Sequence, residues 1–196
     1  MKKLILAFAC ALVAISASAQ FKVEAGGNIG GYSKDSGFNE SLGYFANALY
    51  DINIGDIDRE HFFIETGIGF LANNIQDSDN SSLVNTSWIK VPVLIGSDYS
   101  IGGGYLTAAA GIYYGRGVSG KIENSGVSLD IMNNDIEEIN IFKKNDFGLE
   151  GKAGYTLHMG LGFFLAYQYG LLNVAAQSHS EATTDVVSLG ISYKFF

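Results

Sequence analysis

The sequence contains one cysteine, one proline and more acidic than basic residues. A lone cysteine cannot form a disulfide within the chain, so packing and strand pairing must supply its stability. The 12 Lys and Arg residues, set against 20 Asp and Glu residues, form no basic cluster, which argues against a nucleic-acid partner. The longest apolar run, residues 4–15, is shorter than the roughly 20 residues of a transmembrane helix.

The N-terminal segment predicts export. Two lysines precede the apolar run and Ala-Ser-Ala follows it at 17–19, a pattern typical of a secretory signal peptide that is cleaved before Gln20. We therefore expect residues 1–19 to be removed and residues 20–196 to form one domain. Cleavage removes the only cysteine and two lysines, which leaves 10 basic against 20 acidic residues and a formal charge of −10.

Glycine and aromatic residues are abundant, as in sheet proteins, and eight segments alternate apolar and polar residues. The last segment places Leu189, Ile191 and Tyr193 on one face and Ser188 and Ser192 on the other. Each segment has about 10–13 residues, near the length of a tilted strand that crosses a bilayer. The expected strands are 21–32, 42–54, 61–71, 87–97, 104–116, 146–157, 159–171 and 187–196.

The connections between these strands alternate in length. Long polar links are expected at 33–41, 72–86, 117–145 and 172–185, and short links at 55–60, at 98–103 and around His158. An up-and-down antiparallel barrel places alternate links at opposite ends, and outer-membrane barrels have short periplasmic turns and long external loops. With an even number of strands, both termini lie on the side of the short turns.

Two barrel types share this alternation. A soluble lipocalin-like carrier would bury the apolar face around a ligand, and its outer face would be densely charged. Here the polar face is mostly Gly, Ala, Ser and Asn, which suits a narrow lumen, and aromatic residues such as Tyr44, Phe62 and Tyr155 lie near strand ends, where membrane girdles form. The sequence therefore predicts an all-β fold, an eight-stranded antiparallel transmembrane β-barrel in the outer membrane.

Charged residues of both signs occupy the expected lumen face. Unpaired charge would be costly in so narrow an interior, so we expect ion pairs and hydrogen bonds that fill the barrel. The residues of this lumen charge network are Lys22, Glu24, Glu65, Lys90, Glu150, Lys152 and Lys194.

The C-terminal strand is rich in aromatic residues. A strand in lipid cannot leave an open edge, so the last strand must pair with the first. Tyr193, Phe195 and Phe196 are also similar to the C-terminal signal by which the barrel assembly machinery recognises outer-membrane proteins.

Four stretches resemble the PorT-like outer-membrane β-barrel family of Bacteroidetes. They are WIKVPVLI at 88–95, DFGLEGKAGY at 146–155, YQYGLLN at 167–173 and LGISYKF at 189–195. The resemblance covers nearly the whole mature chain. It implies an outer-membrane location and little about activity, since a fold does not fix a function.

Catalytic and metal-binding patterns are weak. Of three histidines, only His179 has Ser and Glu neighbours, and neighbours in sequence rarely form a triad. The acidic stretches 77–80 and 130–135 lack the spacing of a calcium loop. We expect no enzyme, in particular no lipid-modifying one, and no catalytic, cofactor-binding or metal-binding residues.

The remaining hypothesis is a structural or surface-presentation role through the long loops, with the lipid bilayer and a surface or periplasmic protein as partners. The alternative is a narrow pore or an accessory barrel for transport or secretion. Link 117–145 is too apolar for a solvated loop, which indicates an extended hairpin, a docking segment or a cover for the barrel mouth.

Overall fold

The computed structural model describes residues 19–32, 38–39, 41–77, 83–124, 127–130, 143–174 and 182–195. Within these ranges, no helix is long and apolar enough to cross a membrane. The chain forms eight long strands, β1 (Ala19–Tyr32), β3 (Ser41–Ile57), β4 (Glu60–Asp77), β5 (Leu83–Ile101), β6 (Gly104–Asn124), β8 (Asn145–Leu157), β9 (Leu161–Gly170) and β10 (Thr184–Lys194). Two short strands, β2 (Phe38–Asn39) and β7 (Val127–Asp130), are added at one end.

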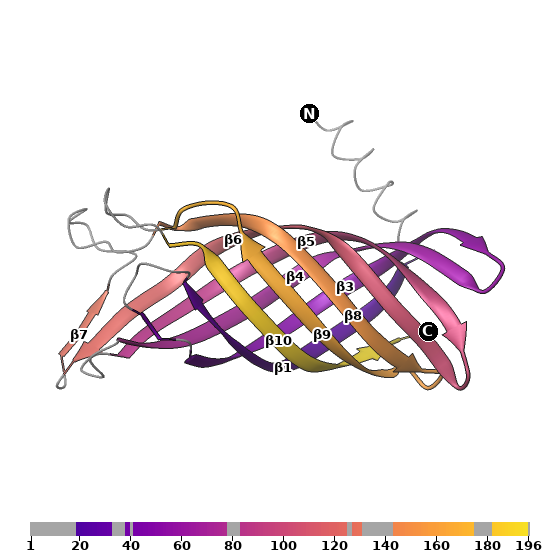
Figure 1. The fold of residues 1–196 in the computed structure, drawn as a ribbon, viewed down its shortest axis with the longest axis horizontal. Helices are drawn as coiled ribbons and strands as arrows, with labels where there is room; N and C mark the ends of the chain where they lie inside the picture. The colour runs from indigo at the N-terminus through magenta and orange to yellow at the C-terminus, as the bar shows by residue number, and fades with distance from the viewer. Residues whose placement is uncertain are drawn as a thin grey trace, which may run out of the picture.

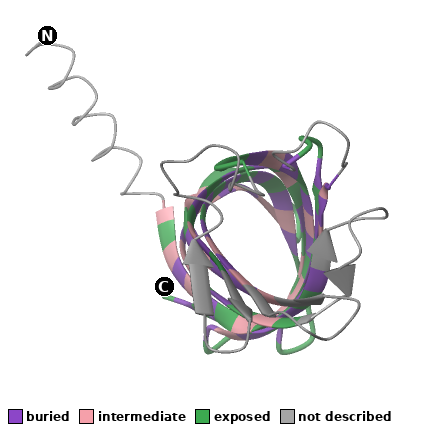
Figure 2. Cartoon of the chain, turned by 90° about the vertical axis from the view of Figure 1, so that its left-hand side faces the viewer, coloured by how far each residue is buried: buried purple, intermediate pink, exposed green. Residues whose placement is uncertain are grey.

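The eight long strands close into an antiparallel barrel. Each pairs with its neighbours in the chain, the ring closes where β1 pairs with β10, and β4 also pairs with β5. Along the closing seam, Lys22 lies opposite Lys194 and Tyr32 opposite Thr184. Figure 2 shows the ring from one end. The predicted eight-stranded up-and-down barrel is confirmed.

Alternate residues face the lumen and the outside of the barrel, as the pattern predicted. On β10, Leu189 and Ile191 are 67% and 53% exposed, whereas Ser188 and Ser192 are buried. The same alternation runs along the other strands (Figure 2). The outer face is therefore apolar, as a lipid-facing surface must be.

The barrel has two unlike ends. At the short-turn end, the links are two-residue turns at 58–59 and 102–103 and a tight turn at 158–160. Asp58 and Gly102 adopt left-handed conformations there, with φ of 52° and 60°. The opposite end, which we call the loop end, carries the longer connections. Residues 1–18 and Phe196 lie outside the described residues.

Four strands are longer than predicted. The strands expected at 42–54, 61–71, 87–97 and 104–116 extend to the bounds of β3 to β6, so links 72–86 and 117–145 are shorter than expected. The prediction ended each strand where apolar alternation stops. Backbone pairing continues beyond that point, as in the pairs Asn74↔Asn85 and Ser87↔Ser119, because hydrogen bonding does not require an apolar face.

Bounds of the other strands also differ from the prediction by one to three residues, for example at the starts of β9 and β10. β9 begins at Leu161, because Gly160 closes a turn by donating to the carbonyl of Leu157 at 2.9 Å. β10 begins at Thr184, three residues before the expected strand, because its pairing with β1 continues to Tyr32.

One side of the barrel wall is taller at the loop end. The β6–β8 ladder ends at the pair Arg116↔Asn145, whereas the β5–β6 ladder continues to Leu83↔Glu123. β7 then pairs with the end of β6, from Lys121↔Asp130 to Asn124↔Val127. We call residues 83–87, 117–124 and 127–130 the ribbon. In Figure 1 it reaches beyond the ends of β9 and β10.

The crowding of the lumen predicts different costs for two glycines. A Cβ atom at Gly96 would meet Phe63 Cζ at 2.6 Å and the Ala108 carbonyl oxygen at 2.7 Å, whereas one at Gly151 would meet nothing within 4 Å. We expect Gly96→Val to lower the free energy of unfolding by about 1–3 kcal/mol through overpacking. Gly151→Val should be nearly neutral. Urea titration in detergent, followed by heat-dependent gel mobility, measures both, and equal midpoints would contradict the assigned faces.

Candidate functional site

The lumen of the barrel holds most of the buried charge. Ten ionisable side chains among the described residues are at most 8% exposed and face the interior: Lys22, Lys90, Lys152, Lys194, Glu24, Glu65, Glu150, Asp51, Asp98 and Asp146. They project from strands of the whole ring, because inward positions alternate along each strand.

Glu65 is the centre of the middle cluster. This fully buried carboxylate on β4 accepts hydrogen bonds from Lys22 of β1 and from Lys152 of β8, the latter at 2.6 Å. Lys152 Nζ also donates to both carboxylate oxygens of Glu24, at 2.9 and 3.0 Å, and Asn47 donates to Glu24 at 3.0 Å. The cluster therefore joins strands on opposite sides of the ring.

A second cluster lies toward the short-turn end. Lys194 of β10 bridges Asp51 of β3 at 3.0 Å and Asp98 of β5 at 2.8 Å. Lys22 contacts Asp51 at 3.3 Å, which connects this cluster to the middle one. Thr107 donates to the other oxygen of Asp98 at 2.5 Å.

A third cluster lies toward the loop end. Lys90 is 3.6 Å from Glu150, and Gln168 donates to the same Glu150 oxygen at 3.0 Å. The Asp146 carboxylate accepts hydrogen bonds from the hydroxyls of Tyr113 and Thr184, each at 2.8 Å. In this cluster, hydroxyl groups donate to the buried Asp146 carboxylate, whereas in the other two clusters lysine ammonium groups donate to the buried carboxylates.

These clusters leave little free space inside the barrel. The cavity among Lys22, Glu24 and Lys152 measures about 20 Å³, and the one beside Lys90 and Asp146 about 10 Å³. Either is close to the size of a single water molecule. By contrast, a cavity of about 870 Å³ opens at the short-turn end. We call this cavity the cup.

The structure brings all seven residues predicted for the lumen charge network into the interior. Five of them belong to the middle cluster and the cluster at the short-turn end, and Lys90 and Glu150 belong to the cluster toward the loop end. Sequence reasoning omitted Asp51, Asp98 and Asp146. In the alternating pattern, Asp51 and Asp146 fall on the polar face of their strands, so the sequence already indicated that both side chains face the lumen. Asp98 was assigned to a short link, although β5 continues through it to Ile101.

The C-terminal aromatic residues lie on the outer face. Tyr193 and Phe195 are 43% and 48% exposed, and their rings meet edge to face at 4.8 Å. The backbone N–H of Phe195 donates to the carbonyl of Phe21 at 2.8 Å, which ties the end of the chain to β1. Phe196, predicted as part of the same signal, lies outside the described residues.

Two histidines sit at the rim of the cup. His61 Nδ1 is 2.8 Å from Asp56 Oδ1, and the rings of His61 and His158 contact Tyr105 edge to face at 6.0 and 5.2 Å. No group of three or more metal-binding side chains gathers in the described part of the chain. His179 and its serine and glutamate neighbours lie outside the described residues, as do positions 78–80 and 131–135 of the acidic stretches.

Comparison with known proteins agrees with this geometry. A family model described as an outer membrane protein beta-barrel domain matches residues 4–195. No curated protein matches the sequence significantly.

Solved structures resemble the chain in fold. Neisserial surface protein A, from Neisseria, has 13% identity and a TM-score of 0.52, with 90% of this chain and 99% of that chain covered. The attachment invasion locus protein Ail of Yersinia pestis has 13% identity and a TM-score of 0.45, with 91% and 99% covered. OprG of Pseudomonas aeruginosa has 10% identity and a TM-score of 0.45, with 91% and 96% covered.

The position of Glu65 predicts a large effect of neutralising it. Glu65→Gln leaves two buried ammonium groups short of a partner and should lower the free energy of unfolding by about 3–5 kcal/mol. Glu60→Gln, the same change at the partly exposed start of β4, should shift it by no more than about 0.5 kcal/mol. Fluorescence of Trp88, the only tryptophan, follows urea unfolding in detergent. Equal midpoints for the two variants would show that the middle cluster does not stabilise the barrel.

Proposed function

The chain belongs to the family of outer-membrane β-barrel domains, and on that premise we propose that it is a closed, non-enzymatic scaffold that presents its ribbon and loops at the cell surface. The membrane holds the barrel through its apolar outer face. Surface or periplasmic proteins are the partners we expect for the presented segments.

The filled lumen is the observation that carries this proposal. Ion pairs cross the ring at two levels, and the cavities between them hold about 20 and 10 Å³. A hydrated solute needs a continuous passage, and opening one here would separate several buried ion pairs at once. A lumen filled by ion-paired side chains is therefore more consistent with a scaffold than with a channel.

The ribbon supports a presentation role. Between the end of the β6–β8 ladder at Arg116 and the end of β6 at Asn124, the sheet extends by eight residues beyond the closed ring. At about 3.3 Å per residue this is roughly 26 Å along the strand. Backbone pairing of β5 with β6 and of β6 with β7 holds it at that height.

The short turns at one end and the longer connections at the other support a direction of insertion. We propose that the short-turn end faces the periplasm, that residues 1–19 are removed there as a signal peptide, and that Tyr193, Phe195 and Phe196 guide the chain to the assembly machinery. We also propose that the protein belongs to the PorT-like subtype. In this orientation both ends of the mature chain lie on the periplasmic side and the ribbon lies outside.

The pore alternative gives a direct test. In planar bilayers, the purified barrel should show no steady single-channel conductance, because the charged clusters block the lumen. Insertion of folded protein is verified by its heat-dependent gel mobility. Steady conductance of the folded wild-type barrel would favour the narrow-pore function over the scaffold.

Surface presentation is tested with single cysteines in the mature chain, which we expect to have none of its own. Lys121→Cys places a thiol on the exposed end of β6, and His158→Cys places one on the exposed turn at the other end. A bulky, membrane-impermeant maleimide should label Cys at position 121 in intact cells and at position 158 only after the outer membrane is permeabilised. The reverse pattern would invert the proposed orientation.

A further inference from the structure

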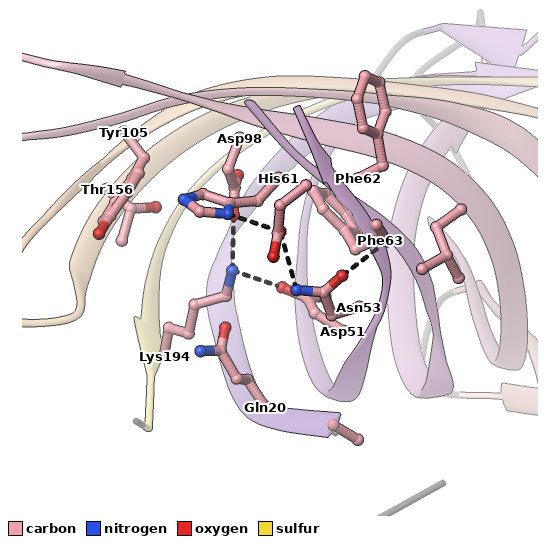
Figure 3. Close-up of a pocket in the computed structure, with 14 residues that line it drawn as sticks. Gln20, Asp51, Asn53, His61, Phe62, Phe63, Asp98, Tyr105, Thr156 and Lys194 are labelled. Carbon is pink, nitrogen blue, oxygen red and sulfur yellow. Dashed lines mark hydrogen bonds and ion pairs between the residues drawn. The ribbon is translucent and has the colours of Figure 1, made fainter. Parts of the chain in front are cut away.

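The cup is a second candidate binding site, at the end of the barrel opposite to the ribbon. It has a volume of about 870 Å³, within the range of small-molecule sites. Figure 3 shows side chains from several strands around it. Those that bear on its chemistry are Asp51, Asp56, Asp98, His61, Tyr105 and Lys194.

The floor of the cup is closed. Lys194 bridges Asp51 and Asp98 across it, at 3.0 and 2.8 Å (Figure 3). Beyond this bridge lie the small interior cavities of about 20 and 10 Å³. The cup is therefore a blind recess, and a ligand that enters from the short-turn end stops at the bridge.

The cup carries an excess of negative charge. Three carboxylates line it, from Asp51, Asp56 and Asp98. Lys194 bridges Asp51 and Asp98, and Lys22 also contacts Asp51 at 3.3 Å, whereas the recorded partners of Asp56 are His61 and Asn53. Hydrogen bonds from His61 and Asn53 lower the pKa of the exposed Asp56 carboxyl below its ordinary value. Asp56 at the rim is thus ionised at neutral pH. A concave acidic surface raises the local concentration of cations.

Aromatic rings complete the walls. Tyr105 stands at the rim between His61 and His158, and the Phe63 ring lies 5.4 Å from the Lys194 ammonium and 5.9 Å from that of Lys22. The faces of such rings attract cations within about 6 Å. An aromatic ring that packs against two lysine ammonium groups of the protein is also a suitable neighbour for the cationic group of a bound ligand.

We propose that the cup binds a small organic cation with a primary ammonium or guanidinium group. The charged group pairs with Asp56 at the rim and packs against the Tyr105 ring, while the rest of the molecule occupies the recess above the Lys194 bridge. The ionised Asp56 at the rim disfavours anions. A bare metal ion is a poorer match, since no group of three or more metal-binding side chains gathers in the described part of the chain. Free amines and basic side chains of periplasmic peptides share the required chemistry.

The test uses the full folded barrel in detergent and 1,4-diaminobutane as the probe, with binding followed by calorimetry or by NMR. We expect saturable binding that weakens at high salt, and no binding of the neutral analogue 1,4-butanediol. Asp56→Asn should weaken binding roughly tenfold, the loss expected for one charge-assisted contact. Tyr105→Leu should also weaken it.

Asp58→Asn is the matched control. It makes the same charge change on the same hairpin, Asp58 does not line the cup, and asparagine tolerates its left-handed backbone. Binding equal to wild type in this variant, with weaker binding in Asp56→Asn, supports the site. Equal loss in both variants, binding of butanediol, or no saturation overturns it. N-acetyl-arginine amide distinguishes a peptide ligand from a free amine. If it binds more tightly than 1,4-diaminobutane, the ligand is a basic side chain of a peptide. If it binds less tightly, the ligand is a free amine.

Discussion

The pairing of the first strand with the last is the constraint on which the rest of the structure depends. In hydrocarbon an unpaired backbone N–H or C=O group costs several kcal/mol, so the sheet must close on itself. The seam runs from Lys22↔Lys194 to Tyr32↔Thr184, and the N–H of Phe195 adds a bond to Phe21 beyond it. Closure with eight strands then sets the width of the interior.

That width explains the composition of the lumen. An eight-stranded ring has room for side chains and little else, and glycine allows close approach at positions such as Gly96 beside Phe63. The charges that remain must neutralise each other. Glu65 therefore pairs with two lysines from different strands, and Lys194 pairs with two aspartates. The charge clusters pack the barrel and also hold strands together across the ring.

The two ends of the barrel offer different chemistry. At the loop end, strands continue past the ring and build a ribbon that is held by the pairing of β5, β6 and β7. At the short-turn end, acidic and aromatic side chains line a recess whose floor is the buried Lys194 bridge. The proposed scaffold function and the proposed cation site would place interactions on both sides of the membrane.

The sequence by itself determined the strand number, the faces and the identity of most lumen charges, because side chains in a strand alternate with period two. It predicted Lys152 and Glu24 to face inward, but not that they pair, since 128 residues separate them and only closure of the ring brings them together. It placed Asp98 in a short link, because the predicted strand ended where its apolar alternation stops, whereas backbone pairing continues to Ile101. The ribbon arises from this continued pairing, and the floor of the cup arises from the bridge of Lys194 between Asp51 and Asp98. Both features depend on contacts between distant segments, so only the tertiary structure decided them.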